Sequence, residues 1–314
     1  MPRGEPADGG DPGPVRRNRY SAPPMLAYRH AFHAGNHADV LKHLVLAQVL
    51  THMAAKGKPY TLIDTHAGAG GYSLEGRYAH TKDEFAAGIG KLWQRDDLPA
   101  ALADYVNLVR RFNGDESTKT WPPLVQYPGS PAIANLLLRA DDRLHLYELH
   151  PTDERILRAF LGKRQHTTVA QSDGFASLHK ELPPPSRRGV VLIDPSYEMK
   201  SDYTKVLAAV REALERFASA VVLVWVPQLR TLESQQLPQR LQNTAAKTAP
   251  KGWLHARLTV APTDARGYGL LGSSMVVVNP PHGLHDTLRE VLPFLVEELG
   301  QFDGANFLLE QQVA

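Results

Sequence analysis

Four short apolar runs, each followed by an acidic residue, constrain this sequence more than any other feature. The acids are Asp64, Glu148, Asp173 and Asp194, and the runs belong to one alternation of strand-like and helix-like segments. Such an alternation is typical of an α/β fold with a mainly parallel, doubly wound sheet. In open sheets of this kind, ligands bind outside the carboxyl ends of the strands. We therefore expect the four acids to lie along one ligand-binding edge.

The run that ends at Asp194 is the strongest candidate for a reaction centre. Val190–Ile193 is apolar and β-branched, with the length of a strand buried on both faces. Asp194-Pro195 follows at once, and we expect the nearby aromatic Tyr197 to be exposed. An aspartate before proline also suits a helix N-cap. The other acid-terminated strands favour a catalytic carboxylate over a simple cap.

A glycine-rich turn follows the first expected strand, Tyr60–Asp64. It reads Thr-His-Ala-Gly-Ala-Gly-Gly from Thr65. Glycine permits positive φ and a close approach of the backbone to a ligand. The lysine and hydroxyl residue of a Walker loop are missing, which disfavours a phosphate cradle. The acidic edge instead suits a positively charged ligand that is rich in hydroxyl and amine donors.

The segment Tyr28–His43 contains four histidines, Asp39 and Lys42 within sixteen residues. Asn36 or Asp39 can cap a helix that continues to about Lys56. The spacings of His30, His33, His37 and Asp39 permit a metal site, although three of these residues are expected in irregular chain rather than on one helical face. Two other interpretations remain, namely an N-terminal cap that folds over a substrate and a set of solvated polar residues.

The remaining pattern completes a seven-stranded sheet. Ser130 and Pro131 have the order of an N-cap and a first helical residue. A helical insertion is expected at about 72–122, and the last two strands are close enough to form a hairpin, which makes the last strand antiparallel. The later strands are expected at Leu144–Glu148, from Thr167 to an end at Asp173-Gly174, and at Val190–Ile193, Ala220–Val226, Leu254–Val260 and Ser274–Asn279.

The composition is that of a globular protein, with 43% hydrophobic and 22% charged residues. No apolar run approaches the ~20 residues of a membrane span, and no secretory signal is recognised, so we expect a cytoplasmic protein. The absence of cysteine excludes disulfides, thiolate metal ligands and cysteine nucleophiles. A net charge of +2 does not by itself indicate a polyanionic partner. Residues 1–24, rich in Pro, Gly and Arg, are expected to be a disordered tail or extension before a single domain over 25–314.

With these motifs in place, the chain resembles a class I S-adenosylmethionine-dependent methyltransferase, with a Rossmann-like α/β fold. More closely it resembles the bacterial 23S rRNA (adenine(2030)-N6)-methyltransferase family, RlmJ, from Met25 to about Pro281. The family usually has Asp-Pro-Pro-Tyr where this chain has Ser196 in the third position. The matching motifs are Tyr28–His30, His33–His43, Asp64–Gly70, Tyr127–Pro131, Glu148–Pro151 and Asp194–Lys200.

The resemblance implies a role for each site residue. Glu148 would hold the ribose hydroxyls of the cofactor, and Asp173 would meet its adenine amine. The implied catalytic residues are Asp194, Pro195 and Tyr197. The implied cofactor contacts are His43, His66, Gly68, Gly70, Ser130, Glu148, Asp173, Gly174 and Asp194, and the implied RNA contacts are Tyr28, His30, Lys42 and Tyr197.

The implied reaction is methyl transfer from S-adenosylmethionine to the N6 amine of one adenine in 23S rRNA, without a metal and with S-adenosylhomocysteine as product. The expected enzyme is a monomer that acts before the ribosome is fully assembled, and it has no membrane partner. An amino-methyltransferase of DNA adenine or protein glutamine is the alternative within enzymes. A metal-dependent hydrolase and a catalytically silent RNA-binding module are alternatives from other classes.

Overall fold

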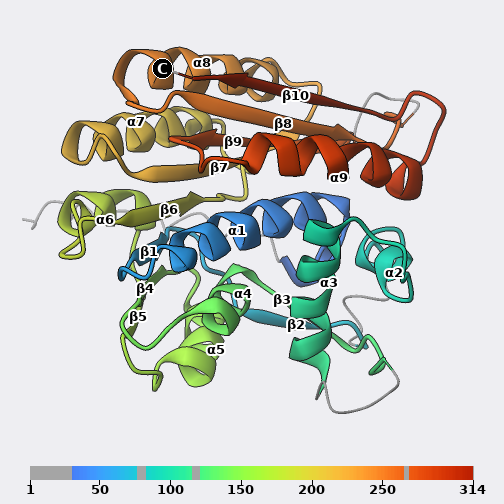
Figure 1. Cartoon of the computed structure of the whole chain (residues 1–314), viewed down its shortest axis with the longest axis horizontal. Helices are drawn as coiled ribbons and strands as arrows, with labels where there is room; N and C mark the ends of the chain where they lie inside the picture. Colours follow the sequence, from blue (N-terminus) through green and yellow to red (C-terminus); the bar gives the residue numbers. More distant parts are fainter. Residues whose placement is uncertain (1–29, 76–82, 115–120, 265–268, 314) are drawn as a thin grey trace, which may run out of the picture.

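Figure 1 shows the computed structural model, which describes residues 30–75, 83–114, 121–264 and 269–313. A single eight-stranded sheet organises the molecule. Its strands are β1 (Thr61–Asp64), β4 (Arg143–Tyr147), β5 (Thr167–Ala170), β6 (Gly189–Ile193), β7 (Val221–Gln228), β8 (Trp253–Thr259), β9 (Gly272–Val278) and β10 (Asn306–Gln312).

The sheet has the order β10-β8-β9-β7-β6-β1-β4-β5. All pairs from β5 to β7 are parallel, whereas β9 lies antiparallel between β7 and β8. The predicted α/β fold with a reversed strand near the end is therefore confirmed. The ends of β8 and β9 are joined through 265–268, and these residues lie outside the described ranges.

The predicted number of strands, seven, is one too few. β10 pairs antiparallel with β8 and extends that edge of the sheet. Most of its residues are exposed, so the segment lacks the continuous apolar run that identified the buried strands.

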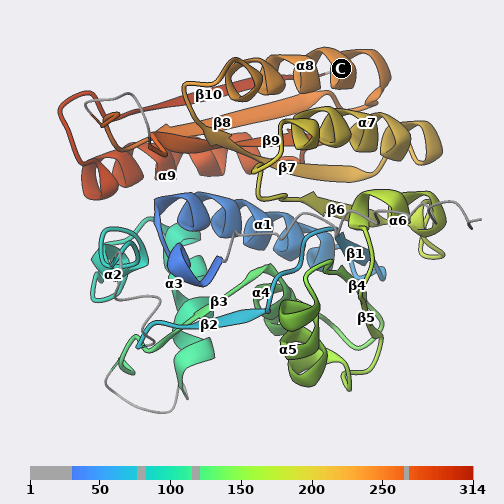
Figure 2. The same ribbon diagram turned by 180° about the vertical axis from the view of Figure 1, so that it is seen from behind.

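Two apolar cores lie on the two faces of the sheet (Figures 1 and 2). One face is covered by α1 (His37–Ala55), α3 (Ala100–Asn113), α4 (Ser130–Leu137), α5 (Pro151–Leu161) and α9 (Leu284–Leu299). The other face is covered by α6 (Gly174–Glu181), α7 (Lys200–Arg216) and α8 (Leu232–Thr248). Among the described residues, no helix is both long and apolar enough to cross a membrane.

Helix α1 is buried almost all round, because it packs against the sheet and against α3, α4 and α9. Its N-cap is Asn36, one of the two predicted caps, whose side chain accepts hydrogen bonds from the backbone of Ala38 and Asp39. The helix ends at Ala55 with Lys56 as C-cap, as predicted. A short 3-10 turn, η1 (His30–Phe32), precedes it.

The segment between β1 and α4 contains two helices, α3 and the four-residue α2 (Ile89–Leu92). It also contains β2 (Gly71–Ser73) and β3 (Gln126–Pro128), which pair antiparallel and were not predicted. Three residues are too few to show a strand period, which explains why the pattern indicated only helices. The expected tail over 1–24, and Tyr28, lie outside the described residues, as do 76–82 and 115–120.

Candidate active site

The four acids lie along the carboxyl edge of neighbouring strands, as the alternation predicted. Asp64 is the last residue of β1, Glu148 and Asp194 directly follow β4 and β6, and Asp173 follows β5 after two residues. Because these strands are adjacent and parallel, the acids occur in the order Asp173, Glu148, Asp64, Asp194 along the edge.

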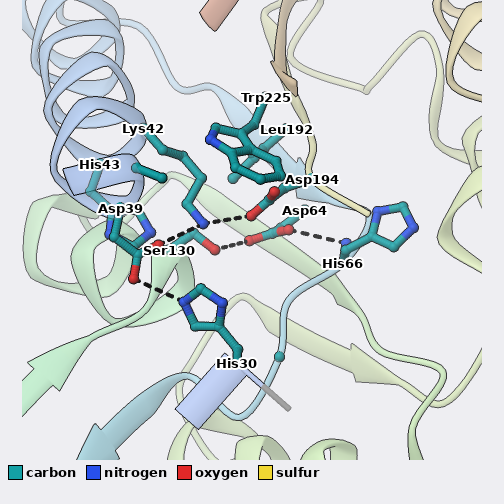
Figure 3. Close-up of polar contacts among 12 residues, drawn as sticks. His30, Asp39, Lys42, His43, Asp64, His66, Ser130, Leu192, Asp194 and Trp225 are labelled. Carbon is teal, nitrogen blue, oxygen red and sulfur yellow. Dashed lines mark hydrogen bonds and ion pairs between the residues drawn. The ribbon is translucent and has the colours of Figure 1, made fainter. Parts of the chain in front are cut away.

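Lys42 connects α1 to this edge (Figure 3). Its Nζ lies 2.6 Å from Oδ2 of Asp194 and 2.8 Å from Oδ1 of Asp39. Burial by itself lowers the pKa of Lys42, but the two carboxylates outweigh it and raise the pKa above the ordinary value. Burial raises the pKa of Asp194, and Lys42 opposes that rise. The buried ammonium thus favours the ionised form of Asp194, since a close opposite charge stabilises a carboxylate.

Asp39 joins Lys42 to the N-terminal turn. Its Oδ2 lies 2.9 Å from Nε2 of His30 and accepts a hydrogen bond of 2.9 Å from the backbone N–H of Gly35. Burial alone would raise the pKa of Asp39, but His30 and Lys42 lower it well below its ordinary value. A chain of contacts therefore runs from His30 through Asp39 and Lys42 to Asp194 (Figure 3).

Ser130 faces the same site, although not as the predicted N-cap. Helix α4 begins at Ser130, with Gly129 as its N-cap and without a side-chain cap bond. The Ser130 hydroxyl donates a hydrogen bond of 2.6 Å to Oδ2 of Asp64. The structure therefore corrects the capping assignment, since this hydroxyl serves a fully buried carboxylate of the sheet edge.

Asp64 is the most perturbed acid of the edge. Burial raises its pKa to about 7, against hydrogen bonds from Ser130 and from the backbone of His66. The His66 ring packs edge-on against Phe175, with the ring centroids 4.6 Å apart. Burial lowers the pKa of His66 to about 4. Thr65 donates its hydroxyl hydrogen to the carbonyl of Leu192, so it accepts from Nδ1 of His66 at 2.8 Å. This bond leaves Nε2 of His66 as an acceptor.

The glycine-rich turn is held against Glu148. The backbone N–H of Gly68 donates to Oε2 at 2.8 Å, and that of His150 donates to Oε1 at 2.7 Å. Gly68 and Gly70 have φ of 61° and 84°, which favours glycine. A Cβ at Gly68 would also clash with the hydroxyl of Tyr72. Both glycines are therefore required by the backbone of the turn.

Asp173 and Gly174 lie at the other end of the edge. Oδ1 of Asp173 caps α6 by accepting from the backbone of Phe175 and Ala176. A Cβ at Gly174 would overlap the carbonyl of Thr65, so only glycine fits against the β1 turn. Both cap bonds use Oδ1, which leaves Oδ2 of Asp173 available to a ligand.

Tyr197 was expected to be exposed, and this expectation is wrong. The side chain is 7% exposed, and its hydroxyl donates a hydrogen bond of 2.6 Å to the carbonyl of Trp225. Its ring packs against those of Tyr203 and Trp225, with centroids 4.7 Å and 5.9 Å away. The residue has φ of 54°, in the left-handed region of the backbone map. Pro195 is buried between Asp194 and this turn.

His43 lies beneath the site rather than at its surface. It is fully buried, and Nδ1 lies 2.8 Å from the hydroxyl of Tyr127, which in turn lies 2.7 Å from that of Tyr105. Burial lowers the pKa of His43 well below its ordinary value. The ring therefore belongs to a buried polar network that supports α1.

Trp225 was not predicted, and Asp39 and Asp64 were given no catalytic or cofactor role, although Asp64 was expected on the acidic edge. Trp225 follows the paired residues Ile193 and Val224, so the parallel register places it level with Asp194. Its ring centroid is 5.8 Å from Nζ of Lys42. Its indole N–H is buried without a partner in the described part of the chain. The pairing register could have revealed Trp225, but its proximity to α1 depends on the tertiary fold.

The histidines considered as metal ligands point to different partners. His30 contacts Asp39, and His33 contacts Glu84 at 2.9 Å. His37 is buried, and burial lowers its pKa to about 4. Within the ranges described by the structure, no three His, Asp or Glu side chains form a group able to hold a metal ion.

The fold and site define a class I, Rossmann-like methyltransferase: a parallel sheet with a reversed strand near its end, a glycine turn after β1 and acids along the carboxyl edge. The family model described as "Ribosomal RNA large subunit methyltransferase D, RlmJ" matches residues 57–309. The chain belongs to this family.

Named relatives and a solved structure agree with this assignment. The chain is 44% identical over 275 residues to ribosomal RNA large subunit methyltransferase J of Escherichia coli, covering 88% of this chain and 94% of the relative. It is 41% identical over 277 residues to the Haemophilus influenzae protein of the same name, with the same coverage. A crystal structure of a Legionella pneumophila protein aligns with a TM-score of 0.79 at 30% identity, covering 89% of this chain and 98% of that one.

Proposed function

We propose that this protein transfers a methyl group from S-adenosylmethionine to the N6 amine of an adenine in 23S rRNA. The observation that carries the proposal is the Asp194-Pro195 turn at the end of β6, with Asp194 held by the buried ammonium of Lys42. The two relatives named as large subunit methyltransferases support ribosomal RNA as the substrate.

The residues of the edge fit the cofactor. Glu148 uses its two oxygens for backbone N–H groups and retains lone pairs for the ribose hydroxyls. Oδ2 of Asp173 can accept from the adenine amine, and Gly68 and Gly70 let the backbone approach the methionine part of the cofactor. His66, Gly70, Ser130 and Gly174 complete the proposed cofactor site, and His43, implied by the resemblance as a cofactor contact, supports the site from beneath. When bound, S-adenosylmethionine supplies an electrophilic methyl group on a positively charged sulfur.

Asp194 and Pro195 prepare the substrate amine. The lone pair of an adenine amine is delocalised into the ring, so the amine is a weak nucleophile. Lys42 occupies Oδ2 of Asp194, and the other oxygen and the Pro195 carbonyl can accept the two N–H bonds of the amine. These bonds draw the nitrogen toward tetrahedral geometry and hold it in line for transfer. Asp194 then accepts the proton that the methylated nitrogen releases.

Aromatic and N-terminal residues hold the base. We propose that Tyr197, held by its hydrogen bond to the Trp225 carbonyl, stacks on an unstacked adenine, an interaction worth about 1–3 kcal/mol in readers of single strands. Because the side chain is 7% exposed, this role requires more of the ring to become accessible when the base enters. Tyr28 and His30 are proposed to close over the base. His30 reaches Lys42 through Asp39, so closure of this segment is coupled to the catalytic carboxylate.

An Asp194→Ala variant tests the proposal. We expect methyl transfer to unmodified 23S rRNA to be lost while S-adenosylmethionine binds with little change, because the carboxylate acts on the amine. Transfer would be measured with labelled cofactor, and cofactor affinity by calorimetry. Asp104→Ala, at an exposed position of α3, is the matched control. Near-normal transfer by Asp194→Ala would contradict the proposed role.

The substrate is tested separately with the wild-type protein. Labelled methyl groups should appear in the rRNA fraction rather than in DNA or protein, and mass spectrometry should map them to N6 of one adenine. Incorporation into DNA adenine or glutamine side chains would favour the alternative amino-methyltransferases. We also expect naked 23S rRNA to be a better substrate than assembled ribosomes, and the active species to be a monomer.

A further inference from the structure

A cavity of about 170 Å³ lies at the amino end of the parallel strands, opposite the candidate active site. It is bounded by the starts of β6 and β7 and by the last turn of α1. Its lining residues are His52, Met53, Lys56, Arg187, Arg188, Gly189, Ser219, Val221, Lys251, Asn279 and Pro281.

The lining is cationic and contains no acidic residue. Lys56, Arg187 and Lys251 are exposed, and within the part of the chain that the structure describes they form no ion pair. Arg188 donates to the backbone carbonyls of Met53 and Lys58, which keep its guanidinium in place. Four cations around one hollow repel one another, and an anion would relieve that repulsion.

The positive charges around the cavity also act on His52. Partial burial lowers its pKa, and Lys56, Lys251, Arg188 and His282 lower it further. The carboxylate that acts on this group of cations is Asp142, which affects Arg188 and is itself paired with Arg139. Asp142 therefore compensates part of the charge of Arg188, and within the described residues it forms no ion pair with Lys56, Arg187 or Lys251.

Helix α1 links the cavity to the active site. Lys42 stands in its first half, at Asp194, and Lys56 caps its other end at the cavity. Fourteen helical residues at 1.5 Å each separate the two lysines by roughly 21 Å. Successive phosphates of one strand in a duplex are about 3.4 Å apart along the axis, so this distance corresponds to about six nucleotides. Because α1 is buried, an RNA that reaches both places must run over the surface and extend at least this far from the target adenine.

We propose that this cavity binds a phosphodiester group of the RNA whose target adenine occupies the active site. The ligand chemistry is a phosphate oxyanion held by Lys56, Lys251 and Arg187, with His52 as a further donor. The choice of RNA as its source rests on the proposed function. Free inorganic phosphate is the other source of the same chemistry.

A charge-reversal pair, Lys56→Glu with Lys251→Glu, tests the site. We expect the KM for 23S rRNA to rise about tenfold, and the slope of log(kcat/KM) against log salt to become shallower by about 2, because two phosphate contacts are lost. The kcat at saturating RNA, the affinity for S-adenosylmethionine and the Tm should stay as in the wild type, since both lysines are exposed and remote from the acidic edge.

The matched control is Arg240→Glu with Lys247→Glu, which reverses the same charge in the groove between α7 and α8. That groove also contains the acid Glu215. An unchanged KM and salt slope in the Lys56/Lys251 pair would overturn the proposal. An equal change in the control pair would also overturn it, because general attraction to RNA would then explain the effect.

Two further measurements separate the possible failures. Titration of inorganic phosphate, followed by the NMR resonances of His52, tests the free anion; a response to phosphate together with an unchanged KM for RNA would assign the cavity to phosphate and overturn the RNA contact. If the wild type binds 23S rRNA without methylating it, the proposed reaction fails. The salt slope of binding, measured by fluorescence anisotropy, then still tests the cavity.

Discussion

Lys42 is the residue on which the candidate active site depends most. It is buried between two carboxylates, and it favours the charged form of both. Removal of one member of a buried ionic group leaves the other charges uncompensated, which is costly. Lys42 therefore influences both the ionisation of Asp194 and the stability of the contacts that connect it to His30.

A Lys42→Gln variant should shift the acid limb of the pH–rate profile to higher pH. Burial raises the pKa of Asp194 and Lys42 lowers it, so without the ammonium the carboxylate forms only at higher pH. We expect kcat to fall about 100-fold, within the range for loss of an acid–base arrangement. Methyl transfer from labelled S-adenosylmethionine, measured across pH, checks both effects.

Lys42→Arg keeps a positive charge beside Asp194 and should leave the acid limb near its wild-type position. Lys58→Gln, at an exposed position, controls for the loss of a lysine in general. An acid limb that stays in place in Lys42→Gln, with the fold intact, would show that Lys42 does not set the ionisation of Asp194.

At the scale of elements, α1 carries the polar residues that face the sheet edge and also the core that supports them. Asp39, Lys42 and His43 lie in its first two turns, and the apolar residues that follow pack against the sheet. The start of the helix therefore fixes where Lys42 meets Asp194. Asn36 sets that start by capping two backbone N–H groups, and its amide donates to Glu84 at 3.0 Å.

An Asn36→Ala variant should lose about 1–2 kcal/mol of the free energy of unfolding, because the cap of α1 is removed. Methyl transfer should fall by more than the fraction of protein that unfolds, since fraying of the first turn displaces Asp39 and Lys42. Urea unfolding and turnover measured on the same preparation check the two effects. Thr51→Ala, at an exposed position of the same helix, should leave both quantities nearly unchanged. A loss of stability with normal turnover would show that the cap does not position the active-site residues.

At the scale of the whole molecule, the two halves of the large sheet have different roles. β10 is the outermost strand on one side of the sheet and pairs with β8 over residues 306–312. The four acids lie at the carboxyl ends of β5, β4, β1 and β6, in the other half of the sheet. An unpaired strand edge is a template for pairing with another chain. In Figure 1, β10 lies above β8 and far from α4 and α5, so it protects the sheet without contributing to the site.

Truncation after Gly304 should expose the edge of β8. We expect a lower Tm and concentration-dependent self-association, because the β8 backbone groups that face β10 lose their partners. Binding of S-adenosylmethionine should persist, as the cofactor residues lie at the other half of the sheet. Calorimetry and light scattering across concentrations check this. A truncated protein that loses cofactor affinity while it remains monomeric would contradict this division of roles.

The sequence alone determined the strand pattern and the acids at the strand ends. Buried parallel strands require continuous apolar runs, so β1 and β6 were readable as strands. The placement of Asp64, Glu148, Asp173 and Asp194 on one edge followed because parallel strands end together. β10 and β2 were missed, since one is largely exposed and the other has three residues.

Only the tertiary structure decided which side chains meet across the site. Lys42 and Asp194 are 152 residues apart, and no local pattern records their contact. Likewise, the hydroxyl of Ser130 serves Asp64 rather than its own helix, and Tyr197 is anchored beneath Trp225 instead of being exposed. Periodicity reports which face of an element is buried. The partner of a buried polar group depends on how α1 and α4 pack against the sheet, and that packing is a property of the whole fold.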